Sequence, residues 1–132
     1  MDVKAEYREA FGEEATENLA EWEQSLLGLE ARPGDTEQVN RMFRAIHTLK
    51  GSAGFLGFDG LQKVAHALES RLATARDAAR PPAPGLIAEL FDGLDLCRSM
   101  IGDLAAGREA TADAGAFLER LGPEATPAAG GA

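Results

Sequence analysis

Apolar residues recur every three or four positions along most of the chain, which is the pattern of amphipathic helices. The first run of this pattern ends at the sequence RPGD (32–35), whose proline and glycine interrupt a helix. A second run begins after Asp35, which together with Gln38 resembles a capping box. The apolar positions of the first run are Val3, Tyr7, Phe11, Ala15, Leu19, Trp22, Leu26 and Leu29. Those of the second run are Val39, Met42, Phe43, Ile46, Leu49 and Ala53.

Three further helices follow from the same reasoning. The sequence GFDG (57–60) breaks the second run, and Asp59 is placed to cap a third helix. The proline-rich sequence RPPAPG (80–85) then separates the third helix from a fourth. A short fifth helix is expected from Asp113 to Leu121, with Phe117 and Leu118 among its apolar residues. The apolar positions of the third helix, which form a stripe along one helix face, are Leu61, Val64, Ala65, Leu68 and Leu72. The apolar stripe of the fourth helix is formed by Leu86, Leu90, Leu94, Cys97, Ile101 and Leu104.

No segment shows β-alternation and no internal repeat is present, so the pattern predicts an all-α protein. Long amphipathic helices with short connections favour an antiparallel up-down four-helix bundle with a short additional C-terminal helix, which we expect to pack on one end. Residues 1–122 form the predicted domain. Residues 123–132, rich in Gly, Ala and Pro, are typical of a flexible linker or tail.

Composition narrows the range of partners. The chain has 132 residues and a formal net charge of −9, which disfavours binding to nucleic acid or to an anionic membrane. Cys97 is the single cysteine, so a reducing compartment is expected. The charged start of the chain lacks an apolar signal core, and no stretch reaches the ~18 apolar residues of a membrane span. We therefore expect a cytoplasmic protein with no membrane partner.

His47 and Lys50 occupy one side of the second helix together with two glycines. At ~100° per residue, His47 falls about 110° from the centre of the apolar stripe, on the shoulder between core and solvent. Gly51 and Gly54 lie further along the same side, although glycine inside a helix costs about 0.5–1 kcal/mol relative to alanine. We expect these glycines to give a partner access to His47. The alternative is that they allow close helix packing.

His66 and Glu69 are three residues apart on the third helix, where Glu69 falls about 80° from the stripe centre, again on a shoulder. If the second and third helices pack antiparallel, this carboxylate can face the imidazole of His47. Simpler interpretations remain at this point. His47 and Lys50 are compatible with an ordinary polar surface, and His66 with Glu69 is compatible with an intrahelical hydrogen bond.

The sequences NRMFRAIHTLKGSAGFLGF (40–58) and AHALE (65–69) together resemble the histidine phosphotransfer (HPt) domain of the CheA family of chemotaxis histidine kinases. The resemblance covers about residues 5–105. It implies that His47 is phosphorylated, that Glu69 orients its ring, and that Lys50 and His66 complete a polar cluster. It also implies a four-helix bundle with an appended fifth helix. The partner-binding residues expected around His47 are Arg44, Thr48, Gly51 and Gly54.

Imidazole suits the role of phosphoryl carrier, because its unperturbed pKa of ~6.5 leaves a neutral ring with a free lone pair at cellular pH. A carboxylate that accepts a hydrogen bond from Nδ1–H would leave Nε2 free to react. Lys50, one helical turn away, can offset part of the added negative charge. The chain has neither a Walker loop nor a kinase glycine loop, so it is expected to hold no cofactor itself.

The expected partners are therefore the ATP-bound catalytic domain of a histidine kinase and the receiver domain of a response regulator, with ATP and Mg²⁺ supplied by the partners. CheA-family proteins continue into a second module and a kinase core, so we expect either an excised domain or a free-standing phosphorelay protein. Two other hypotheses are a metal site formed by His47, His66 and Glu69, and a helical interaction module that is not phosphorylated. Lys50 makes the metal site unfavourable for a cation.

Overall fold

The structure, a computed structural model, describes residues 4–122, which form five α-helices and no strand. The helices are α1 (Ala5–Ala31), α2 (Thr36–Leu56), α3 (Asp59–Asp77), α4 (Pro84–Ala105) and α5 (Ala114–Leu121). The all-α class and each predicted helix are confirmed. The expected linker, residues 123–132, and Val3 of the first stripe lie outside the described residues.

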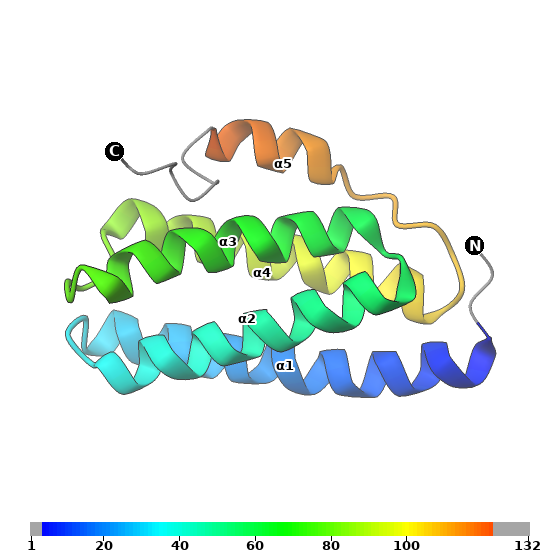
Figure 1. The fold of residues 1–132 in the computed structure, drawn as a ribbon, viewed down its shortest axis with the longest axis horizontal. Coiled ribbons are helices and arrows are strands. Elements are labelled where there is room, and N and C mark those ends of the chain that lie inside the picture. Colours follow the sequence, from blue (N-terminus) through cyan, green and yellow to red (C-terminus); the bar gives the residue numbers. More distant parts are fainter. Residues whose placement is uncertain (1–3, 123–132) are drawn as a thin grey trace.

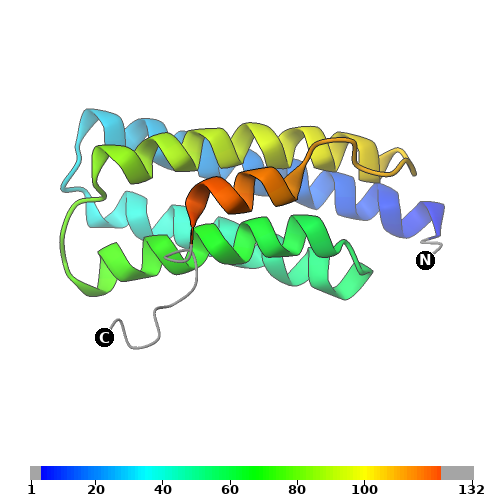
Figure 2. The same cartoon turned by 90° about the horizontal axis from the view of Figure 1, so that it is seen from above.

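Helices α1 to α4 lie alongside one another as an up-down bundle (Figures 1 and 2). Helix α2 packs against α1 and α3, and α4 also packs against α1 and α3. The connections between successive helices are short, which makes sequence neighbours antiparallel. The predicted bundle topology is confirmed, and α2 and α3 run along each other for most of their length. No helix in this part of the chain combines the length and apolar character needed to cross a membrane.

Helix α5 packs across α3 and α4 and not on one end of the bundle, which corrects the expectation from the sequence (Figure 2). It buries Phe117 and Leu121. Gly93 of α4 allows the close approach of α3, because a Cβ there would overlap the Leu68 side chain, while the same Cβ would lie at ordinary contact distance, 3.4 Å, from the Phe117 ring of α5. The Arg71 guanidinium on α3 also donates a hydrogen bond to the carbonyl of Leu121. The side-on contact thus buries apolar side chains of α5 and also gives the carbonyl at its end a hydrogen-bond donor.

The apolar stripes of α1 to α4 meet in one core, as their spacing predicts. Cys97 lies in this core, where complete burial raises the pKa of its thiol to about 12. This environment supports its interpretation as a small buried side chain. Tyr7 does not follow the predicted stripe, because its residue is 54% exposed and the first buried residue of α1 is Phe11. The core contact of α1 therefore begins one turn later than predicted.

Two helix starts differ from the sequence predictions. Asp35 caps α2 by accepting a hydrogen bond from the Glu37 amide at 3.1 Å. In a capping box the Gln38 side chain would also accept a hydrogen bond from the Asp35 amide. This bond is absent from the described turn, where the Gln38 side-chain oxygen accepts from Arg41 instead. Helix α4 begins inside the proline-rich run, with Pro84 in its first turn, a position where the missing N–H carries no penalty.

The turn between α2 and α3 places the two site-bearing helices next to each other. Gly57 ends α2 with φ of 78°, a left-handed conformation that favours glycine. The Phe58 amide then donates to the Ala53 carbonyl at 2.8 Å. Phe58, and not Asp59, is the N-cap residue of α3, so the predicted cap is wrong by one position. Asp59 lies in the first turn, where its negative charge still interacts favourably with the helix dipole.

Candidate functional site

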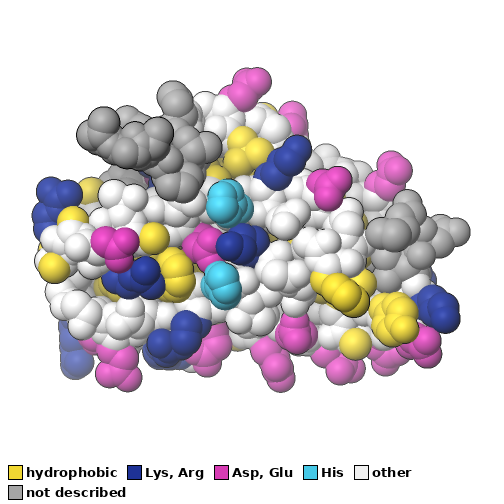
Figure 3. All heavy atoms as spheres, viewed as in Figure 1, with side chains coloured by type: hydrophobic (Ala, Val, Ile, Leu, Met, Phe, Trp, Pro, Cys, Tyr) yellow, Lys and Arg dark blue, Asp and Glu magenta, His cyan; other side chains and the backbone are white. Residues whose placement is uncertain are grey.

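The two histidines of the chain lie on one face of the molecule, with a basic and an acidic side chain between them (Figure 3). His47 belongs to α2 and His66 to α3. The His47 side chain is 61% exposed, so it is more open to solvent than its predicted shoulder position suggests. An imidazole with this exposure on a helix surface is accessible to another macromolecule.

Glu69 of α3 binds two side chains of α2. Its Oε2 atom accepts a hydrogen bond from Nδ1 of His47, and its Oε1 atom accepts one from Nζ of Lys50 at 2.7 Å. The residue is only 7% exposed, which corrects the prediction of a shoulder position. Its angle on α3 was not sufficient to predict this burial, because the α2 side chains that contact it come from a different part of the sequence.

The environment of Glu69 keeps its carboxyl group ionised. Burial acts to raise the pKa, since it disfavours the charged form. The hydrogen bonds from Lys50 and His47, together with the positive charges of these groups, act in the opposite direction and leave the pKa of Glu69 below its ordinary value. Glu69 is therefore a carboxylate at neutral pH and can only accept hydrogen bonds.

This arrangement determines the tautomer of His47. A carboxylate that contacts Nδ1 requires the proton on Nδ1, so in the neutral ring the lone pair is on Nε2. Nε2 is the ring nitrogen remote from Glu69, and the ring is mostly exposed. The structure thus shows the expected contact between the carboxylate and the imidazole, with Glu69 on one edge of a mostly exposed ring, and the orienting role of Glu69 stays a prediction.

His66 lies next to this cluster without a hydrogen bond to it. Its Nδ1 atom is 3.9 Å from Oε1 of Glu69, beyond hydrogen-bonding distance, and its side chain is 53% exposed. The simpler interpretation of an intrahelical hydrogen bond is therefore wrong. His66 lines a hollow of about 560 Å³ between α3 and α5, together with Lys50 and Lys63. The hollow places two amino groups near the cluster in a protein that is acidic overall.

The two glycines of α2 have different surroundings. A Cβ at Gly51 would have no heavy atom within 4 Å, which agrees with the predicted open approach. A Cβ at Gly54 would lie 2.5 Å from Nε2 of Gln62 on α3. Gly54 therefore contacts α3, as the alternative of close helix packing expects, and its predicted role in giving a partner access stays a prediction. Arg44 and Thr48, the other predicted partner-binding residues, are both exposed on α2.

Phe43 also lies at the site, although the sequence pattern assigned it to the core. Its ring is parallel to the His47 ring within 9°, with 6.2 Å between the centroids. The Arg76 guanidinium from the end of α3 lies 4.1 Å from the centroid of the Phe43 ring. The spacing of four residues between Phe43 and His47 was a usable signal, because such residues share a helix face. No sequence signal pointed to Arg76, which approaches from the far end of another helix.

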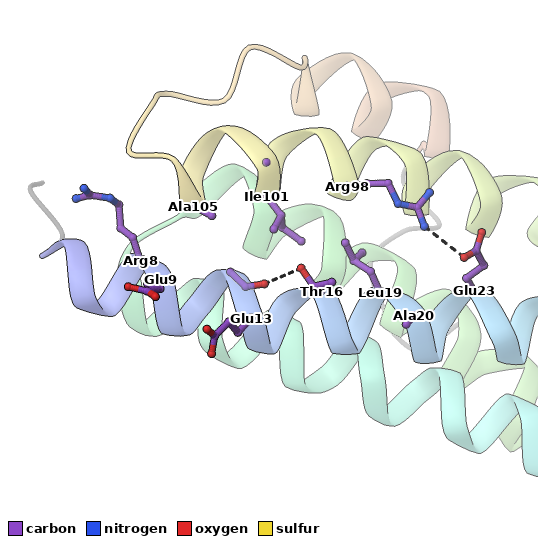
Figure 4. Close-up of a pocket in the computed structure, with 12 residues that line it drawn as sticks. Arg8, Glu9, Glu13, Thr16, Leu19, Ala20, Glu23, Arg98, Ile101 and Ala105 are labelled. Atoms are coloured by element: carbon purple, nitrogen blue, oxygen red, sulfur yellow. Dashed lines mark hydrogen bonds and ion pairs between the residues drawn. The ribbon is translucent and has the colours of Figure 1, made fainter.

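Other hollows of the described chain lie away from this cluster. One of about 850 Å³ runs between α1 and α4, with Leu19 and Ile101 in its lining (Figure 4). Arg98 and Glu23 face each other across it at 3.6 Å. It contains neither histidine. Among residues 4–122, no three His, Cys, Asp or Glu side chains are grouped so that they could hold a metal ion.

Comparison with known protein families shows which family contains this chain. Residues 6–107 match the Hpt domain family over most of the described helices. The chain belongs to the Hpt domain family. The match runs from the second residue of α1 to just beyond the end of α4, and so contains His47, Lys50, His66 and Glu69.

Relatives similar to this Hpt domain include chemotaxis proteins named CheA. The chemotaxis protein CheA of Halobacterium salinarum is 31% identical over 116 residues, which cover 88% of this chain and 17% of that protein. CheA of Salmonella typhimurium is 45% identical over 76 residues, which cover 58% of this chain and 11% of that protein. The chain thus spans less than a fifth of the length of these relatives.

Solved structures agree with the sequence comparison. The CheA phosphotransferase domain from Thermotoga maritima has a TM-score of 0.73 and 37% identity, covering 78% of this Hpt domain and 98% of that chain. The phosphorylated P1 domain of CheA3 in complex with CheY6 from R. sphaeroides has a TM-score of 0.83 and 27% identity, covering 92% of this chain and 97% of that one. The bundle therefore has the fold of CheA phosphotransfer domains.

Proposed function

We propose that this domain is a phosphoryl carrier in two-component signalling of the chemotaxis type. His47 accepts a phosphoryl group from the ATP-bound catalytic domain of a histidine kinase and passes it to an aspartate in the receiver domain of a response regulator. The observation that carries this proposal is the pairing of an exposed imidazole with a buried carboxylate on its Nδ1 edge. Family membership and the similar structure of a phosphorylated P1 domain bound to CheY6 support it.

The phosphoryl group moves by displacement at phosphorus. The Nε2 lone pair of His47 forms a bond to the γ-phosphorus of ATP, while the bond from phosphorus to the bridging oxygen breaks and its electron pair leaves with ADP. The ring becomes positively charged, its Nδ1 proton remains on the hydrogen bond to Glu69, and the carboxylate offsets the charge. In the second step an aspartate oxygen of the receiver attacks phosphorus, and the P–N electron pair returns to Nε2.

Lys50 has two roles in this scheme. It donates to Oε1 of Glu69 at 2.7 Å, which helps to keep the carboxylate ionised and oriented. It also lies one turn from His47, where its positive charge lessens the repulsion that a phosphoryl group meets on a protein of net charge −9. His66, at the edge of the cluster, adds a second imidazole to the surface that a partner covers.

The partner domains supply what this chain does not. Phosphoryl transfer depends on positioning and charge neutralisation, for which ATP-bound Mg²⁺ and nucleotide contacts are the usual means. We propose that ATP and Mg²⁺ are held by the kinase and receiver domains. A cytoplasmic location is proposed with them, since the partners and the nucleotide are found there and Cys97 remains a free thiol. The same carrier chemistry applies whether the domain belongs to a larger kinase or acts alone.

The test is phosphorylation by a CheA-type kinase domain with radiolabelled ATP, followed by addition of a receiver domain. The wild-type domain is expected to take up label that is labile in acid and stable in base, as a phosphoramidate is, and to lose it to the receiver. His66→Gln is expected to retain labelling, at a reduced rate, whereas His47→Gln is expected to take up none. Acid-labile label on His47→Gln would show that the phosphoacceptor has been misassigned.

A further inference from the structure

The hydrogen bond that His47 donates to Glu69 restrains only one edge of the His47 ring. It places Nδ1, but a ring held at one atom can still pivot about that contact and swing Nε2 out of line. The side chain is 61% exposed, so core packing does not enclose it. In-line displacement at phosphorus is sensitive to such misplacement, because reacting atoms must be held in a near-attack geometry. A second restraint on the plane of the ring is therefore expected near His47.

Phe43 is in position to supply this restraint. It precedes His47 by four residues on α2, so both side chains project from the same helix face. The two ring planes deviate by only 9°, and the centroid separation of 6.2 Å is within the range of offset-stacked aromatic pairs. Phe43 is half-buried and packs against the hydrophobic core, so its own ring is less free to move than the imidazole.

Arg76 holds the Phe43 ring from a second helix. Its guanidinium carbon lies 4.1 Å from the ring centroid, which is within cation–π distance. Arg76 lies in the last turn of α3 and also contacts the Asp77 carboxylate at 3.3 Å. The ring is therefore restrained by the core and by α3, while Glu69, also on α3, restrains the Nδ1 edge of His47.

We propose that Phe43, held by Arg76, is a positioning residue that sets the plane of the His47 imidazole and so directs Nε2 toward the incoming phosphorus. This inference rests on the proposed carrier function, but it concerns the ring before any phosphoryl group arrives. Phe43 acts through His47 and is not itself a catalytic residue. The bonds that form and break are those of the displacement already described, in which Nε2 gains phosphorus and ADP leaves.

The experiment compares Phe43→Leu, which keeps an apolar side chain but removes the ring, with Phe43→Tyr, which keeps the ring. Phe91→Leu is the matched control, because Phe91 is also half-buried against the core but lies on α4. The order parameter of the His47 ring is measured by NMR relaxation without kinase or ATP. The kcat and KM for phosphorylation by a CheA-type kinase domain are then measured separately.

Phe43→Leu is expected to lower the order parameter of the imidazole and to reduce kcat about three- to tenfold with KM unchanged. Phe43→Tyr should retain both values, and Arg76→Gln should give a smaller change in the same direction. The proposal is overturned if Phe43→Leu leaves the imidazole as ordered as in the wild type, if Phe91→Leu has an equal effect, or if only KM changes. A wild-type domain that is not phosphorylated on His47 would instead refute the carrier function, whereas the order parameter tests the restraint independently.

Discussion

Lys50 Nζ lies 2.7 Å from Oε1 of Glu69, so a nearly buried carboxylate has its counter-ion on the helix that also carries His47. The two oxygens of Glu69 are thereby divided between a cation and an imidazole. The cation keeps the carboxylate ionised against the effect of burial, and the ionised carboxylate holds the Nδ1 proton of His47. The Nδ1 edge of an exposed ring is thus held by a group that solvent barely reaches.

Glu69→Gln should weaken the control of the His47 tautomer. A glutamine amide can either accept a hydrogen bond through its oxygen or donate one through its nitrogen, so it no longer requires the proton on Nδ1. We expect a more mixed tautomer population in the ¹⁵N spectrum of the imidazole and slower phosphorylation by a kinase domain. Unchanged ¹⁵N shifts together with an unchanged rate would remove Glu69 from the mechanism.

The lowered pKa of Glu69 should make part of the stability of the domain depend on pH. Because the folded-state pKa is below the unfolded value, this contribution is fully present above the ordinary glutamate pKa of about 4.3 and is lost as the pH falls through the folded-state value. Glu69→Gln is expected to lower the free energy of unfolding at pH 7 by about 1–3 kcal/mol. The difference from wild type should narrow below about pH 4.3.

Chemical denaturation at a series of pH values measures this dependence. Glu13→Gln, at an exposed position of α1, makes the same change in net charge and serves as the control. Its difference from wild type should stay small across the same range. Parallel curves for wild type and Glu69→Gln down to pH 3 would mean that ionisation of Glu69 does not stabilise the fold.

Gly51→Gln should separate partner access from folding. No atom lies within 4 Å of a Cβ at this position, and glutamine is a better helix former than glycine, so the melting temperature should stay the same or rise. A long side chain one turn from His47 would enter the space that a partner's active site needs. We expect both transfer from the kinase and transfer to the receiver to fall sharply. Gly102→Gln, on an equally open position of α4, should leave both rates unchanged.

The result for Gly51→Gln has two informative alternatives. A marked loss of stability would show that Gly51 serves helix packing, contrary to its open surroundings. Normal transfer by a stable variant would show that this surface does not set the approach of the partner.

Gly54→Ala should gain less stability than Gly51→Ala. Both replacements favour the helix by up to about 1 kcal/mol. The new methyl at position 54 would meet the Gln62 amide at 2.5 Å and force that side chain to move. In a background with Gln62→Ala, Gly54→Ala should recover the full gain. Urea denaturation of the single and double variants measures this coupling, and equal gains at both glycines in the original background would contradict it.

Helical periodicity by itself determined the fold class, the existence of each helix and most of the core, although Tyr7 proved exposed and α4 begins within the proline-rich run. Each stripe predicts which face of a helix is buried, because side chains three and four residues apart share a face and only burial against another helix stabilises so many apolar residues. The motif around His47 and the second motif ending at Glu69 also indicated the family before any geometry was known, since their residue types and spacings are specific.

The tertiary structure decided the features that depend on two helices at once. Glu69 is nearly buried, and Gly54 faces Gln62, because α2 and α3 approach each other with a particular register and separation. The angle of a residue on its own helix contains no information about that separation. For the same reason the contact of Arg76 with Phe43, and the side-on packing of α5, became visible only when the helices were brought together.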